Sequence, residues 1–426
     1  MTPVTTLQTE ELAESTAVRG FWTRSRKSGA LFVALGVFAI AVFGSLAPAG
    51  EVARFNFSDD QVSWSIPIPA QAGAIGFGAL CVLAGVGLLT RLAAHHLAWA
   101  TTVALFGFLM SFLCWQVAGG FMSLVQLASG TLFLALPLVF GALSGVLCER
   151  AGVINIGIEA QFLVGAFAGA LVGTATGSVW LGLIAAAVAG LLIAMLLAVF
   201  AIRYLVDQIV LGVILVVLAL GVTSFLYERL MQPNQSELND PAAFPTIAIP
   251  VLSDIPLLGP VLFTGNIFLY LALALVVVVH LQLFHTRWGL RVRAVGEHPT
   301  AADTVGVNVF RIRYMSVLYG GLIAGIGGAF FTLASGLQFN KNMTDGRGFI
   351  ALAAMIFGRY SPFGALAAAL LFGFAQQLAI YLTAIDSEIS SDFLEMAPYL
   401  ATLFAVAGLV GKVRPPAADG KPYVKA

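Results

Sequence analysis

Long uncharged stretches dominate this sequence and limit what it can fold into. Eleven of them hold about twenty mostly apolar residues, the length that crosses a bilayer as a helix. They are residues 29–47, 70–90, 97–118, 125–147, 160–177, 179–201, 208–227, 265–284, 313–335, 363–382 and 394–411. Charged residues make up only 10% of the chain, against roughly 25% in a soluble domain. The pattern excludes a soluble globular protein and predicts an all-α, polytopic transmembrane bundle of about 10–12 helices.

A twelfth apolar run, residues 348–358, is too short for an ordinary crossing. We expect it to be re-entrant or half of a broken helix. The segment before the first stretch is polar and mildly acidic, and no cleavage site of small residues follows that stretch. We therefore expect 29–47 to be a retained helix rather than a signal peptide.

The distribution of lysine and arginine predicts the orientation. With the N-terminus inside and twelve alternating crossings, seventeen Lys and Arg residues fall on the inner side and four on the outer side. Cytoplasmic loops are enriched in positive charge, so we expect both termini in the cytoplasm. The formal net charge is +0, which gives no sign of a nucleic-acid partner.

A polar cluster interrupts the apolar pattern just before the fifth stretch. An acidic residue inside a membrane helix costs roughly 2.5–3.5 kcal/mol on insertion scales, so Glu159 needs a partner, water or an interfacial position. A broken helix lining a cavity would supply these, which predicts a substrate pathway or gate at Asn155, Gly157, Glu159 and Gln161. The alternative is structural, with Glu149–Arg150 an ordinary interfacial pair and Glu159 near the cytoplasmic surface.

The longest inner loop, residues 285–312, concentrates basic charge. Pro299 suits the first turn of a short helix, and Gly306 can end it. Its apolar side would be formed by Ala301, Ala302, Val305 and Val307. Such a helix on the cytoplasmic face would dock to a soluble partner; the alternative is a plain positive-inside loop without one.

A third segment, DGRGFIALAAMIFGRYSPFGALAAALLFG from Asp345 to Gly373, is punctuated by glycines. They delimit the short apolar run and a tight corner at Arg359–Pro362, although close helix packing would select the same small residues. Beyond the last stretch, we expect the tail from Lys412, which contains Pro415 and Pro416, to be disordered.

The sequence lacks the motifs of the common membrane enzymes. No GxxxxGK[ST] phosphate loop occurs, and GLVGKV at Gly408–Val413 has neither the spacing nor the hydroxyl. HExxH, CxxC and GxSxG are also absent. The three cysteines lie inside apolar runs and are expected to be core residues. We expect no catalytic residue, no metal site and no ATPase of the chain's own.

Three motifs resemble a known family. GVINIGIEAQFLVGAFAGA resembles the GVxNIGxEGQ signature of ABC-importer permease subunits for nucleosides and simple sugars, a group allied to the branched-chain amino acid and ribose permeases. RAVGEHPTAADTVGVNV resembles that family's coupling-helix motif, and GRGFIALAAMIFGRYSPFGALAAALLFG resembles its third signature. The likeness runs from about Leu124 to Leu409.

The apolar stretches, the predicted orientation and the resemblance together divide the chain into a cytoplasmic tail (1–28), N-terminal transmembrane helices (29–123), a permease core (124–411) and a cytoplasmic C-terminal tail (412–426). The resemblance also implies a multi-pass subunit of the cell membrane that contacts lipid and pairs with a second permease subunit, identical or paralogous. Cytoplasmic ATP-binding subunits would bind ATP, and an extracytoplasmic lipoprotein would deliver the substrate. Asn155, Gly157 and Glu159 match the core signature. The residues expected to couple to the ATPase are Gly296, Glu297, Ala301, Ala302, Asp303 and Gly306.

The resemblance favours nucleosides as the substrate, moved by alternating access. One alternative is the same role for a simple sugar such as ribose or galactose. An ion-coupled secondary transporter is an alternative of another class, and a polytopic membrane enzyme is a third.

Overall fold

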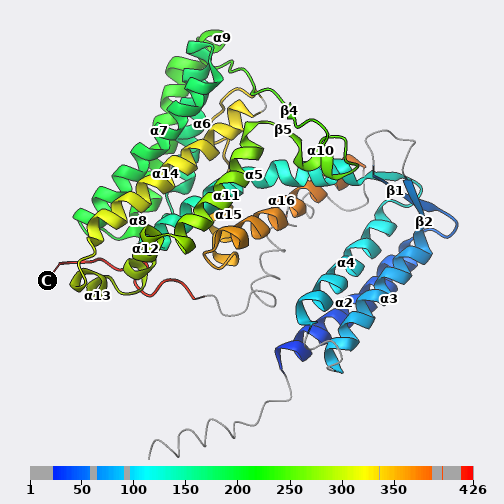
Figure 1. The fold of residues 1–426 in the computed structure, drawn as a ribbon. Coiled ribbons are helices and arrows are strands. Elements are labelled where there is room, and N and C mark those ends of the chain that lie inside the picture. Colours follow the sequence, from blue (N-terminus) through cyan, green and yellow to red (C-terminus); the bar gives the residue numbers. More distant parts are fainter. Residues whose placement is uncertain are drawn as a thin grey trace, which may run out of the picture. The chain divides into compact units, whose positions relative to one another are not determined.

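The computed structural model describes residues 23–57, 65–90, 96–334, 336–385, 396 and 414–425. The chain divides into two compact units, Met1–Leu124 and Val125–Ala426. Within the described residues, ten helices are long and apolar enough to cross a membrane, and α15 (Arg347–Phe357) is a shorter apolar helix. The prediction of an all-α polytopic bundle with a half-length helix is confirmed (Figure 1). The expected crossing at 394–411 lies outside the described residues.

The first unit is a three-helix bundle of α2 (Arg24–Leu46), α3 (Ala70–Leu89) and α4 (Leu97–Gln116). Two glycines seven residues apart on each helix, Gly29 and Gly36 on α2 and Gly78 and Gly85 on α3, let the helices touch. A Cβ at Gly36 would lie 2.7 Å from the backbone nitrogen of Val82, and one at Gly85 would lie 2.7 Å from that of Val33. Small residues serve in this way where two membrane helices approach closely.

A small sheet that the apolar pattern does not predict joins the helices of this unit. The strand order is β2 (Ser65–Pro69), β1 (Val52–Asn56), β3 (Phe121–Ser123). β1 is antiparallel to β2 and parallel to β3. These strands fall in connections between apolar stretches, where short runs such as Val52–Asn56 carry little periodic signal.

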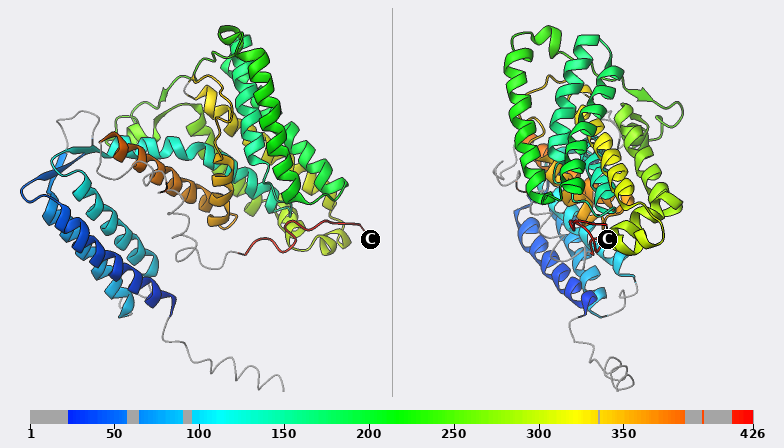
Figure 2. Two further views of the ribbon diagram at one scale, coloured as in Figure 1. Left: turned by 180° about the vertical axis from the view of Figure 1, so that it is seen from behind. Right: turned by 90° about the vertical axis from the view of Figure 1, so that its left-hand side faces the viewer.

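The second unit is built around two buried helices, α5 (Leu124–Glu149) and α14 (Val309–Leu333). α6 (Ile158–Thr176) and α7 (Val179–Ala198) pack against α14, and α8 (Gln208–Leu226) packs against α6 and α7 (Figure 2). α11 (Ile267–His285) and α16 (Pro362–Ala384) contact α5. Glycines again set the spacing, because a Cβ at Gly190 of α7 or at Gly165 of α6 would lie 2.5 Å from the backbone of Gly325 in α14.

Short elements fill the connections. The π-helical turns η2 (Val199–Arg203) and η3 (Tyr227–Met231) extend α7 and α8. Between α8 and α11 lie α9 (Gln235–Leu238), α10 (Leu258–Leu262) and the paired strands β4 (Ile247–Ala248) and β5 (Thr264–Gly265).

The basic loop before α14 is mostly helical. α12 (Arg287–Glu297) precedes α13 (Pro299–Thr304), in which Pro299 occupies the first turn as expected. Gly306 follows with φ +86°, the left-handed conformation that ends a helix. The sequence predicts α13 but not α12.

The expectation of a disordered tail is wrong for residues 414–425. This segment lies beside α12 and α13 in Figure 1 and is fastened there by backbone hydrogen bonds, such as that from Ala418 N to Gly296 O (2.8 Å). The contacts use backbone groups, which residue composition does not reveal.

Candidate functional site

The connection between α5 and α6 is a non-helical segment, residues 150–157, that turns the chain inside the second unit. α5 ends where Gly152 adopts φ +82°, and Val153 N donates to Cys148 O (3.1 Å) in the pattern of a glycine C-cap. The next amide, Ile154 N, finds its acceptor on α8, at Gln208 Oε1 (2.7 Å). The amides of Val153 and Ile154 are thus satisfied inside the protein, as a membrane interior requires.

Two amide side chains predicted for the site pair within this break. Asn155 Nδ2 donates to Gln161 Oε1 and to Ser144 Oγ, each at 3.2 Å. Gln161 Nε2 donates back to Asn155 Oδ1 (3.4 Å). Both side chains are fully buried. Gly157 stands directly before the first residue of α6. Three of the four predicted residues therefore meet in one hydrogen-bonded turn.

Glu159 points to a different element, α15. Its Oε1 accepts from Thr344 Oγ1 (2.6 Å) and Gly346 N (2.9 Å), and its Oε2 accepts from Gly348 N (2.6 Å). The side chain is 3% exposed. Amides at a helix N-terminus lack intrahelical partners and carry the positive end of the helix dipole. A buried carboxylate at this position is therefore matched by hydrogen bonds and by charge.

The opposite end of α15 is held by the same connection. Arg150 Nε donates to Tyr360 O (2.8 Å), and its Nη2 donates to Arg359 O (3.3 Å), just past the last turn of α15. The helix has 11 residues, about 16 Å at 1.5 Å per residue, which is about half of a hydrocarbon core. Residues 150–159 thus bracket a half-length helix from both ends.

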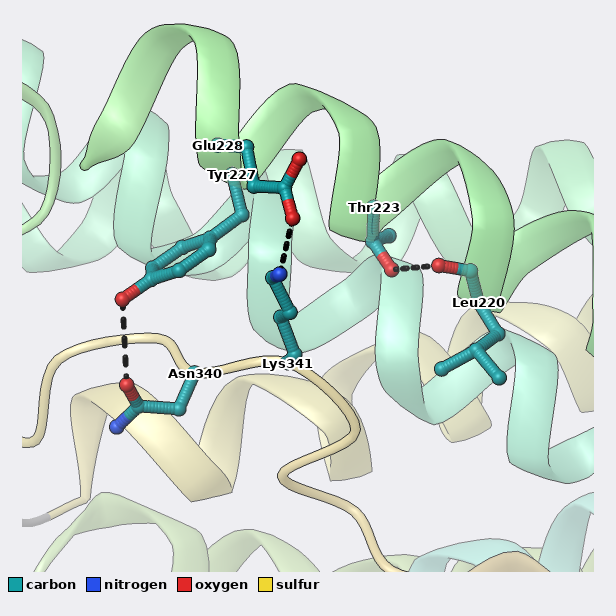
Figure 3. A network of polar contacts seen from close by, with 6 residues as sticks. All are labelled: Leu220, Thr223, Tyr227, Glu228, Asn340 and Lys341. Carbon is teal, nitrogen blue, oxygen red and sulfur yellow. Dashed lines mark hydrogen bonds and ion pairs between the residues drawn. The ribbon is translucent and has the colours of Figure 1, made fainter. Parts of the chain in front are cut away.

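The chain that leads into α15 from α14 is held by η3 and by Asn239, the residue after α9. Asn239 is fully buried; its Oδ1 accepts from Phe339 N (2.7 Å) and its Nδ2 donates to Phe339 O (3.0 Å). Figure 3 shows Tyr227 and Glu228 of η3 reaching Asn340 and Lys341, the latter as an ion pair. The segment is therefore held at residues 339–341 before it enters α15.

The predicted coupling residues lie on α12, α13 and the turn after them. Gly296 abuts the break, because a Cβ there would lie 2.2 Å from Arg150 O. Ala302 is buried, whereas Ala301 is exposed. After α13, Val305 is 78% exposed. Glu297 Oε2 accepts from Ala417 N (3.2 Å), and Asp303 pairs with Lys425 at 3.8 Å.

Sequence reasoning missed several residues that complete these contacts. Thr344 lies directly before the third glycine-rich motif and Gly348 lies within it. The glycine pattern marks this segment in the sequence, but nothing in the sequence indicates that it donates hydrogen bonds to Glu159. Arg313, 2% exposed in α14, donates from Nη1 to Lys421 O (3.0 Å). Within the described residues, no group of three or more His, Cys, Asp or Glu side chains could hold a metal ion.

These features define a class: a multi-pass helical membrane protein with an interrupted helix pair and an exposed helical loop next to the break. The match to known families agrees. Residues 127–410 fit the family model described as the branched-chain amino acid transport system permease component. The chain belongs to this family of transporter permease subunits.

Several relatives are similar to this chain over more than half of its length. The guanosine ABC transporter permease NupQ of Bacillus subtilis is 42% identical over 71% of this chain and 99% of NupQ. The nucleoside ABC transporter permease NupC of Lactococcus lactis is 37% identical over 70% of this chain and 96% of NupC. The glucose ABC transporter permease TsgB13 of Haloferax volcanii is 31% identical over 56% of this chain and 65% of TsgB13.

The same two bacteria each contribute a second, more distant match. NupP of Bacillus subtilis, a guanosine ABC transporter permease, is 24% identical, and NupB of Lactococcus lactis, a nucleoside ABC transporter permease, is 25% identical. Similar permeases therefore occur as two chains in one organism. No solved structure gives a significant match to this chain.

Proposed function

We propose that this chain is one permease subunit of an ATP-driven ABC importer for nucleosides. The observation that carries the substrate class is the 42% identity to a guanosine permease along nearly the whole of that relative. The nucleoside permease NupC supports the same class. A simple sugar such as ribose or galactose is the second candidate, which the glucose permease TsgB13 favours.

The importer would contain more than this chain. A second permease subunit completes the pathway, and the paired relatives from two bacteria support a paralogue over an identical copy. Separate cytoplasmic subunits bind and hydrolyse ATP, so this chain needs no cofactor. An extracytoplasmic lipoprotein delivers the substrate. The excess of Lys and Arg on one side supports insertion in the cell membrane with both termini in the cytoplasm.

The geometry supports a path by which ATP hydrolysis could reach the membrane interior. The exposed face of α13 and Val305 would dock to the ATPase subunit. Movement of α13 displaces Gly296, which abuts the backbone of Arg150. Arg150 and Glu159 hold the two ends of α15. A shift of the break would therefore move α15 as a unit, which is the rigid-body switching that alternating access needs.

In this proposal Asn155, Gly157, Glu159 and Gln161 act as a gate. The side chains of Asn155, Glu159 and Gln161 join elements to one another, and Gly157 stands directly before α6, so these residues would control whether the half-length helix moves. Substrate selection would depend largely on the delivering lipoprotein and on the pathway between the two permeases.

Uptake measurements test the proposal. Cells that carry this gene with its ATPase and lipoprotein partners should accumulate labelled guanosine, and unlabelled nucleosides should compete while ribose and galactose do not. Competition by the sugars alone would assign the second candidate. Uptake that persists after ATP depletion, but is abolished by collapsing ion gradients, would favour a secondary transporter instead.

A further inference from the structure

The C-terminal segment, residues 414–425, bridges the coupling loop and the break between α5 and α6. We call this segment the strap. On the coupling side, Ala418 N donates to Gly296 O (2.8 Å) and Ala417 N donates to Glu297 Oε2 (3.2 Å). The Tyr423 ring is 5% exposed and lies 5.4 Å from the ring of Phe310, near the start of α14. The strap is therefore packed, not merely adjacent.

The other side of the strap faces the break. A Cβ at Gly420 would lie 2.7 Å from Ile154 Cδ1, and one at Gly152 would lie 3.0 Å from Ala418 O. The Asp419 carboxyl faces the Glu149 carboxyl at the end of α5. The strap thus contacts the break by close packing, and its carboxyl group faces that of the residue just before the break.

A buried arginine fixes the middle of the strap. Arg313 Nη1 donates to Lys421 O (3.0 Å). Within the described residues, the Nε and Nη2 groups of Arg313 and the Oδ1 atom of Asp419 have no hydrogen-bond partner. Arg313 and Asp419 carry opposite charges and interact electrostatically.

A van der Waals contact and a hydrogen bond differ in the forces that they resist, and this difference suggests a role for the strap. Gly296 touches the backbone of Arg150 directly, and such a contact transmits a push but not a pull. The hydrogen bonds of Ala417 and Ala418 to α12, and of Arg313 in α14 to Lys421, resist separation as well. If the coupling helix alternately moves toward the break and away from it, both kinds of interaction are needed to move the break each time.

We infer that the strap is a positioning element that makes the break follow the coupling helix in both directions of the transport cycle. The inference rests on the proposed function for its role in transport. The mechanical linkage itself follows from the contacts of Ala418, Asp419 and Arg313 and can be measured without a substrate.

The test compares hydrogen–deuterium exchange in the purified full chain and in a chain that ends at Pro415. Glu297→Ala removes a coupling-side bond of the strap. In the full chain it should raise exchange in peptides covering residues 150–157 at least threefold. In the shortened chain it should add no further change. An equal effect of Glu297→Ala in both backgrounds, or no effect in either, overturns the inference.

Three more variants keep the test decisive. Ala418→Pro removes the amide that donates to Gly296 and should raise exchange in residues 150–157 as the shortened chain does. This variant keeps the test available if the shortened chain inserts poorly into the membrane. Asp419→Ala removes the carboxyl that faces Glu149 and should likewise raise exchange in residues 150–157. Val424→Ala is the control, because Val424 is 68% exposed, and it should behave as the unmodified protein.

Transport then separates this inference from the proposed function. In the assembled importer, the shortened chain should retain its ATPase partner but lose at least 90% of nucleoside uptake. Full uptake by the shortened chain contradicts the strap. Lack of uptake by the unmodified chain contradicts the nucleoside proposal instead, and leaves the exchange result to decide the strap.

Discussion

The carboxylate of Glu159 accepts a hydrogen bond of 2.6 Å from the backbone amide of Gly348, although the two residues are 189 positions apart. The bond ties the start of α6 to the start of α15. The fit is close, since a Cβ at Gly348 would lie 2.5 Å from Glu159 N. The relationship makes the break and the half-length helix one mechanical unit.

Removing the Glu159 carboxylate should impair transport more than assembly. Glu159→Ala leaves the amides of Gly346 and Gly348 and the hydroxyl of Thr344 without their acceptor. An unmade buried hydrogen bond costs about 1–3 kcal/mol, so we expect local loosening of α15 with the rest of the bundle intact. Uptake per membrane-inserted chain should fall at least tenfold. Normal uptake at normal membrane levels would return Glu159 to a purely structural role.

Adding one methyl group at Gly348 should have a similar effect by a different cause. Gly348→Ala drives a Cβ into the backbone of Glu159 and pushes α15 away from its cap. We expect uptake to fall at least tenfold. Gly221→Ala is the matched control, because a Cβ there meets nothing within 4 Å, and it should leave uptake within twofold of the unmodified chain. Equal uptake by both variants would contradict the close fit.

A charge placed after α13 should separate the chain from its ATPase. Val305 is 78% exposed, and Val305→Asp would bury an unpaired charge in a docked complex, which is costly. Co-purification of the ATPase subunit should be lost while membrane insertion stays normal. Val251→Asp changes an equally exposed valine in the connection between α8 and α11 and should leave the complex intact. Retention of the ATPase by Val305→Asp argues against docking at this helix.

The strap should bind more tightly in mild acid. Burial raises the pKa of Asp419 from 3.8 to about 6, so the docked strap binds a proton that the undocked strap releases between these values. The resulting stabilisation is complete below pH 3.8 and is lost as the pH rises through 6. The groups facing Asp419 are Glu149 and Cys148 of α5, Arg313 of α14 and Tyr360 after α15.

Spin-label mobility measures this pH dependence. The native cysteines are buried, so a nitroxide can be placed selectively with Val424→Cys. Its mobility should rise between pH 5 and pH 7. The increase should vanish when Asp419→Asn is added, because the amide does not titrate. A pH response that survives in Asp419→Asn would assign the effect to another group.

Local patterns in the sequence predict the helices well and the tertiary contacts poorly. Apolar runs predict the ten membrane-spanning helices of the described residues, and Pro299 and Gly306 predict the ends of α13. These features can be predicted because the residues that determine them are close together in the sequence. The partner of Glu159 lies far along the chain, and one sequence carries no signal for that pairing. The strap depends on backbone amides such as Ala418 N, which every non-proline residue possesses.

Reconstitution tests the central claim most directly. Vesicles would contain this chain, its partner permease and the ATPase subunits, with the lipoprotein supplied on the opposite side. The account predicts that labelled guanosine accumulates only when ATP is present on the ATPase side, and that Val305→Asp abolishes this accumulation. Accumulation driven by an ion gradient alone, without ATP or ATPase subunits, would contradict it.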